Sequence, residues 1–106
     1  MKVMYLGHRR NLYNVALYTR KRGFELKTVT GESIRLSDMK EEILAFEPEL
    51  IFADILSFAE PEDEICEILE EVKLALNCRA AVIAAGRSME NKMVRSFAAA
   101  GFKYFV

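Results

Sequence analysis

The sequence predicts an α/β domain built on a doubly wound, five-stranded parallel sheet. Short apolar runs alternate with longer amphipathic stretches, without repeats or linker-like segments, as in successive βα units. A length of 106 residues suits one hydrophobic core. Residues 3–6 and 50–53 are apolar at every position. Such runs are typical of central strands that helices cover on both sides.

The first half of the chain predicts two βα units. After the strand at 3–6, residues 11–22 carry Leu12, Val15 and Thr19 at helical spacing, and Gly23 suits the helix end. Residues 26–30 mix polar and apolar side chains, which favours an edge strand. Asp38 and Glu41 fit a capping box for a helix over 38–46.

The second half continues the alternation. The strand at 50–53 ends at Asp54, and Pro61 suits the first turn of a helix reaching residue 76. Residues 80–85 form the next strand, Ser88 can cap a fourth helix that Gly101 closes, and a fifth strand begins at residue 104. We expect the strand order 2-1-3-4-5, with (βα)4β connectivity.

Composition excludes several classes of protein. No apolar run approaches the roughly 20 residues of a membrane span, and the N-terminus lacks the apolar region of a secretory signal. We therefore expect a cytoplasmic protein that binds neither membrane nor nucleic acid. Two cysteines, Cys66 and Cys78, provide neither a disulfide framework nor a metal-ligand cluster. Acidic residues concentrate in the middle: residues 31–77 hold fourteen Asp or Glu and three Lys or Arg.

Ligands of open parallel sheets bind beyond the carboxyl ends of the strands, where the strand order reverses. Three segments should meet at this edge, and their residues are the candidate site: Asp54, together with Gly7, His8, Arg9, Arg10, Gly86, Arg87 and Ser88.

The sequence resembles the receiver domain of two-component response regulators, which has a flavodoxin-like fold. Residues 47–55 (EPELIFADI) resemble the family's phosphoacceptor strand, which implies that Asp54 occupies the acceptor position. Residues 23–26 (GFEL) resemble the entry to the second strand, and residues 99–105 (AAGFKYF) resemble the entry to the fifth.

The remaining family positions differ. Receivers hold Mg²⁺ with an acidic pair after the first strand, and here those positions are Gly7 and His8. The family's hydroxyl residue aligns with Gly86, with Ser88 as the nearest hydroxyl, and its lysine would lie beyond Val106. We therefore expect no metal, no cofactor and no enzymatic activity.

The resulting prediction is a pseudo-receiver: a non-catalytic signalling or protein-interaction module. Its partner would be another protein or an output domain, and residues 1–106 would be the N-terminal part of a longer protein. The fifth helix that receivers carry is missing from the sequence. Without it, Leu50, Phe52, Val82 and Phe105 should leave an apolar surface beside Leu12, Val15 and Tyr18, which a homodimer could also cover.

Two alternatives stay open. The basic residues at the carboxyl edge could bind a small anion or a nucleotide, because guanidinium groups and helix N-termini favour anions. Alternatively, Arg9, Arg10 or Arg87 could simply pair with Asp54. Residues 1–30 also resemble the first unit of Rossmann-like glycosyltransferase and cobalamin-binding domains, although the cobalamin signature is absent.

Overall fold

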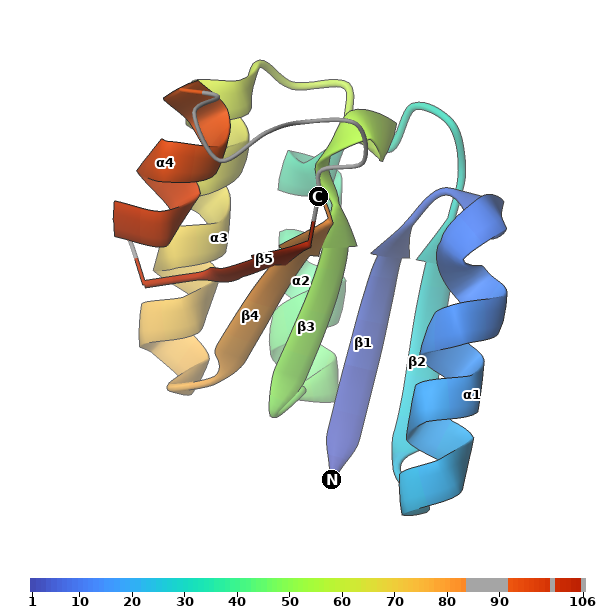
Figure 1. Ribbon diagram of the computed structural model, residues 1–106. Helices are drawn as coiled ribbons and strands as arrows, with labels where there is room; N and C mark the ends of the chain where they lie inside the picture. The colour runs from blue at the N-terminus through green and yellow to red at the C-terminus, as the bar shows by residue number, and fades with distance from the viewer. Residues whose placement is uncertain (84–91, 100, 106) are drawn as a thin grey trace.

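Strands and helices alternate along the chain in the computed structural model, which describes residues 1–83, 92–99 and 101–105 (Figure 1). The strands are β1 (Lys2–Gly7), β2 (Glu25–Thr30), β3 (Leu50–Asp54), β4 (Arg79–Ile83) and β5 (Lys103–Phe105). The helices are α1 (Leu12–Arg22), α2 (Leu36–Phe46), α3 (Glu62–Leu76) and α4 (Lys92–Ala99), with short 3₁₀ turns η1 (Arg9–Asn11) and η2 (Ile55–Ser57).

The sheet is parallel, with the order β2-β1-β3-β4-β5. This confirms the parallel α/β architecture and places the apolar strands β1 and β3 at its centre. Strands β1 to β4 contain five or six residues each and form most of the sheet. The last strand is reduced to three residues that pair with β4. The order reverses between β1 and β3, so the carboxyl ends of these two strands define the edge where ligands of such sheets bind.

Alternate residues of the strands enter two separate cores. On one side, Val3, Tyr5 and Phe52 pack with Val15 of α1. On the other side, a larger core joins the sheet to α2, α3 and α4. Val82 belongs to this second core and is 1% exposed, so its expected place beside α1 was wrong. Side chains alternate along a strand, and β4 directs Ala81, not Val82, toward the α1 face.

Helix α2 begins two residues before the predicted start. The capping box expected from Asp38 and Glu41 does not start this helix; its first amides, those of Leu36 and Ser37, donate to the Glu60 carboxylate at 2.8 and 2.6 Å. A side chain 24 residues away thus caps the helix, which local spacing could not predict. These bonds outweigh the effect of burial and lower the pKa of Glu60.

Part of the expected site lies outside the described residues. The expected site residues Gly86, Arg87 and Ser88 are not among the described residues. The last two residues of the strand predicted at 80–85 also lie outside the described ranges. Among the helices that are described, none is long and apolar enough to cross a membrane.

Candidate functional site

Asp54 is the centre of the candidate site, at the carboxyl end of β3. Its side chain is fully buried, with 0% exposure. One carboxylate oxygen, Oδ1, accepts a hydrogen bond from the backbone N–H of Leu56 at 3.2 Å and so caps the η2 turn. The strand residue at the phosphoacceptor position of the family resemblance therefore starts the turn that leads toward α3.

The second oxygen of Asp54 faces the start of α1. The amide nitrogen Nδ2 of Asn11 donates to Oδ2 at 2.8 Å. The guanidinium of Arg10 lies farther away, with Nη2 3.9 Å from the same oxygen, and its side chain is 52% exposed. The expected ion pair with an arginine is present but long, and the closest partner of Asp54 is an amide.

Gly7 and Tyr5 enclose the carboxylate from β1. A Cβ atom at Gly7 would lie 2.5 Å from Cβ of Asp54 and 2.7 Å from the Tyr5 hydroxyl oxygen, so no larger residue fits without a shift. The Tyr5 hydroxyl donates a short hydrogen bond to the carbonyl oxygen of His8. Burial raises the pKa of this hydroxyl; hydrogen bonding with Asn11 opposes the shift, and the Asp54 carboxylate adds to it. Tyr5 is thus a neutral donor at pH 7.

The basic residues of this edge do not converge on one point. His8 caps the η1 turn, because its Nδ1 accepts the backbone N–H of Arg10 at 3.1 Å. Its other nitrogen, Nε2, lies 4.0 Å from the carboxylate of Glu32. Arg9 is exposed. Of the four cationic or potentially cationic residues predicted here, only Arg10 approaches Asp54 within the described chain.

The described residues contain neither a cluster of metal ligands nor an activated thiol. No group of three or more His, Cys, Asp or Glu side chains in the described ranges is arranged to hold a metal ion. Burial, with help from Glu70, raises the pKa of Cys66 to about 11, and burial also raises that of Cys78. Both thiols are therefore protonated at pH 7 and weakly nucleophilic.

Comparison with known proteins gives no assignment: no family model and no curated protein matches the chain. The function is therefore inferred from the residues of the site itself. The sequence alone did not identify two residues of this site, Asn11 and Tyr5. Asn11 was assigned only to a helix start, and Tyr5 only to a strand. The available signal was the polar hydroxyl of Tyr5 in an otherwise apolar run, since a buried tyrosine hydroxyl needs a partner.

Proposed function

We propose that this chain is a receiver-like protein-interaction module that works without phosphoryl transfer to Asp54. The single observation that carries the proposal is the state of the Asp54 carboxylate. It is fully buried, and each of its oxygens accepts a hydrogen bond, one from Asn11 and one from Leu56. The resemblance to receivers in residues 47–55 supplies the class of module.

A phosphoacceptor must meet two physical requirements that Asp54 does not satisfy. The attacking oxygen has to line up with the phosphorus atom, which requires an open approach. The charge of the transferring group has to be neutralised, usually by Mg²⁺ held on carboxylates. Gly7 and His8 bring no carboxylate to this edge, and a side chain at position 7 would collide with Asp54 itself. A buried, hydrogen-bonded carboxylate of this kind is better suited to capping the η2 turn than to attacking a phosphorus atom.

The test is incubation with acetyl phosphate and Mg²⁺, followed by intact-protein mass spectrometry. We expect no stoichiometric gain of a phosphoryl group, and the same result for Asp54→Asn. A His8→Asp variant, which returns one carboxylate to the edge without entering the space at Gly7, should also stay unmodified while Asp54 remains buried. A full phosphoryl adduct that Asp54→Asn abolishes would end the proposal.

Small-anion or nucleotide binding is the competing function, and the exposed Arg9 and Arg10 favour it. However, the backbone amide of Arg10 already donates to His8, and the Arg10 guanidinium faces Asp54. An anion on the half-exposed Arg10 guanidinium would therefore be repelled by the Asp54 carboxylate, which lies 3.9 Å from Nη2. Calorimetric titration with phosphate and with ADP separates the two functions, because saturable binding lost in Arg10→Ala would support the anion site.

A further inference from the structure

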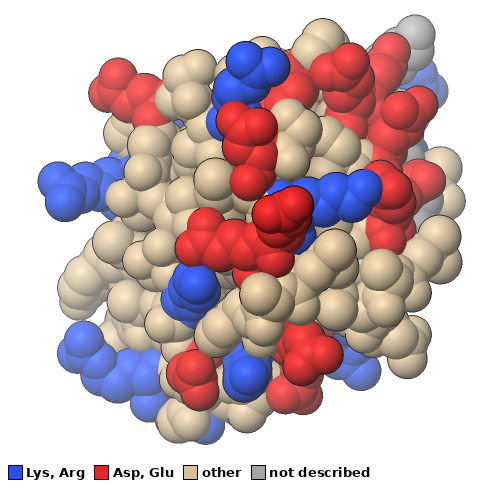
Figure 2. Space-filling model, turned by 180° about the vertical axis from the view of Figure 1, so that it is seen from behind, with Lys and Arg blue, Asp and Glu red and all other residues tan. Residues whose placement is uncertain are grey.

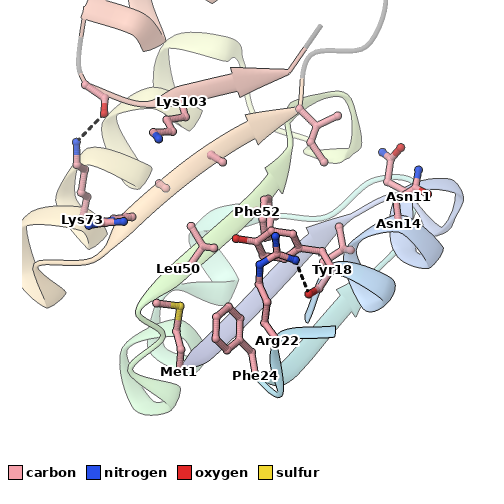
Figure 3. Close-up of a pocket in the computed structure, with 16 residues that line it drawn as sticks. Met1, Asn11, Asn14, Tyr18, Arg22, Phe24, Leu50, Phe52, Lys73 and Lys103 are labelled. Atoms are coloured by element: carbon pink, nitrogen blue, oxygen red, sulfur yellow. Dashed lines mark hydrogen bonds between the residues drawn. The ribbon is translucent and has the colours of Figure 1, made fainter. Parts of the chain in front are cut away.

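A groove of about 880 Å³ lies on the α1 face of the sheet and reaches Asn11, the residue that donates to Asp54 (Figure 3). Its floor consists of Leu50 and Phe52 of β3 and Ala81 and Ile83 of β4. Helix α1 contacts β1 and β2 and forms one wall, while α2, α3 and α4 pack on the opposite side. Within the described residues, the α1 face of β3 and β4 therefore has no helix of its own.

Helix α1 contributes aromatic and polar side chains to the wall. Tyr18 packs edge-on against Phe52, with ring centroids 5.6 Å apart, and also against Phe24 at 6.3 Å. These contacts fix the aromatic side chains in place at the junction of wall and floor. The expected apolar surface is only partly exposed: Leu50 and Tyr18 are half-buried in the hollow, whereas Phe52 and Val15 are buried.

Among the described residues, the charged side chains that line the groove are cations: Arg22, Lys73, Arg79 and Lys103. Arg22 lies over the Tyr18 ring, with Cζ 3.9 Å from the centroid, and Lys73 donates to the Gly101 carbonyl at 3.1 Å. Arg79 and Lys103 are exposed. Within residues 1–83, 92–99 and 101–105, no Asp or Glu lines the groove. The groove therefore favours an occupant that is apolar along its centre and anionic at its margins.

The dimensions of the strands match a helix. Strand β3 has five residues, which span about 17 Å at 3.3 Å per residue. A helix of about 11 residues has the same length at 1.5 Å per residue. Helix α1, also of 11 residues, covers the neighbouring strands in this way. The faces of parallel sheets are normally covered by helices, and the small side chain of Ala81, on the α1 face, permits close approach.

We propose that this groove binds an amphipathic helix of a partner protein, with leucine-like residues toward Phe52 and glutamates or aspartates toward the four cations. The proposal rests on the proposed function as an interaction module and identifies the surface and its partner. A second copy of the chain fits less well. Its acidic helix α3, prominent on the opposite face (Figure 2), buries its apolar stripe of Ile65, Leu69 and Val72 against its own sheet.

The test uses two fluorescein-labelled synthetic peptides of about 14 residues. Both carry leucines at i, i+3, i+4 and i+7, and the remaining surface positions are glutamate in one and lysine in the other. We expect the glutamate peptide to bind about tenfold more tightly by fluorescence anisotropy. Its binding should shift the backbone NMR signals of Phe52, Ala81 and Tyr18. Equal affinity of the two peptides, or shifts located elsewhere, would overturn the proposal.

Charge-reversal variants provide the matched controls. Arg79→Glu and Lys103→Glu should each weaken binding of the glutamate peptide roughly two- to fivefold, as expected for exposed ion pairs. Arg20→Glu and Lys21→Glu change the net charge equally but do not line the groove, and they should leave the affinity nearly unchanged. Equal losses in all four variants would show that only net charge matters and would contradict a defined groove.

Two further outcomes would replace the partner helix with another occupant. If the Phe52 and Ala81 signals shift with protein concentration alone and sedimentation shows a dimer, the groove binds a second copy. If dodecyl phosphate saturates the groove while the glutamate peptide does not bind, the occupant is a small amphiphile. Neither measurement involves Asp54. Failure of peptide binding would overturn the groove and leave the phosphorylation result as it stands. A phosphoryl adduct on Asp54 would overturn the proposed function, while peptide binding is measured on the unmodified protein.

Discussion

Replacing Gly7 with alanine should destabilise the fold measurably, because the added methyl group has nowhere to go. Its carbon would lie 2.5 Å from Cβ of Asp54 and 2.7 Å from the Tyr5 hydroxyl oxygen. A Cβ atom cannot rotate away, so relief requires a shift of β1 against β3. Overpacking of this kind costs about 1 to 3 kcal/mol. Loss of glycine's freedom in the unfolded chain offsets about 0.4 to 1 kcal/mol, which leaves a net loss of roughly 1 to 2 kcal/mol.

A second substitution identifies the source of the strain. Tyr5→Phe alone should cost about 1 kcal/mol, because it removes the hydrogen bond to the His8 carbonyl. In the Gly7→Ala background the same change also removes the contact at 2.7 Å, so its cost should fall by about 0.5 kcal/mol or more. The contact between the two Cβ atoms remains, and the double variant should stay less stable than the parent.

Urea denaturation followed by circular dichroism gives the free energies of unfolding for this cycle. Gly31→Ala serves as the matched control, since its added Cβ would meet only the side chain of Ile34, with Cγ1 at 3.3 Å and Cδ1 at 3.9 Å. We expect that control to stay within about 1 kcal/mol of the parent. If Gly7→Ala loses no more than Gly31→Ala, or if Tyr5→Phe costs the same in both backgrounds, the packing of Gly7 against Asp54 and Tyr5 is not as described.

Two other substitutions test the hydrogen bonds around this edge. Asn11→Ala should lower the free energy of unfolding by about 1 to 3 kcal/mol, because it leaves a buried Asp54 oxygen without its hydrogen bond. The control Asn14→Ala, at an exposed neighbouring position, should lower it by less than about 0.5 kcal/mol. Similar losses in the two variants would show that Asn11 is not the partner of Asp54. Glu60→Gln should cost about 0.5 to 2 kcal/mol at pH 7 in urea denaturation. Since the folded-state pKa of Glu60 is lowered, its contribution is present above the ordinary value of 4.5 and disappears as the pH falls through the folded-state value. A loss that persists undiminished at pH 3 would contradict the capping role.

The order of the elements could be predicted because each depends on local patterns. The continuously apolar residues of β1 and β3 predicted buried central strands, and Gly23 marked where the first helix ends. The parallel architecture followed from the alternation of these elements. Helix ends were less predictable where the cap comes from a distant residue, as Glu60 does for α2.

The partners of Asp54 could be predicted only in part. Charge complementarity indicated an arginine, and Arg10 does lie within ion-pair distance. The shorter bond comes from Asn11, because η1 brings the side chain of Asn11 closer to the carboxylate than that of Arg10. Sequence spacing places both residues at the same edge but does not determine which side chain turns inward. Likewise, the face of the sheet on which Val82 lies depended on the register of β4. A shift of one residue in that register places every side chain of the strand on the opposite face.

The hydrogen bonds that follow Asp54 give its carboxylate a structural role. Asp54 caps η2, and the Ser57 carbonyl at the end of that turn accepts the backbone N–H of Ile34 at 2.7 Å. The Ala59 N–H returns a bond to the Ile34 carbonyl at 2.8 Å, and Glu60 then caps α2. One continuous set of bonds therefore joins the carboxyl end of β3 to the start of α2. Because Asp54 begins this set, a phosphoryl group on Oδ1 would break the bond from Leu56 and with it the η2 cap, whereas a phosphoryl group on Oδ2 would break the bond from Asn11. The groove beside α1 meets this set of bonds at Asn11, which lines the groove and donates to Oδ2 of Asp54, whereas the bond from Leu56 that caps η2 is accepted by the other oxygen.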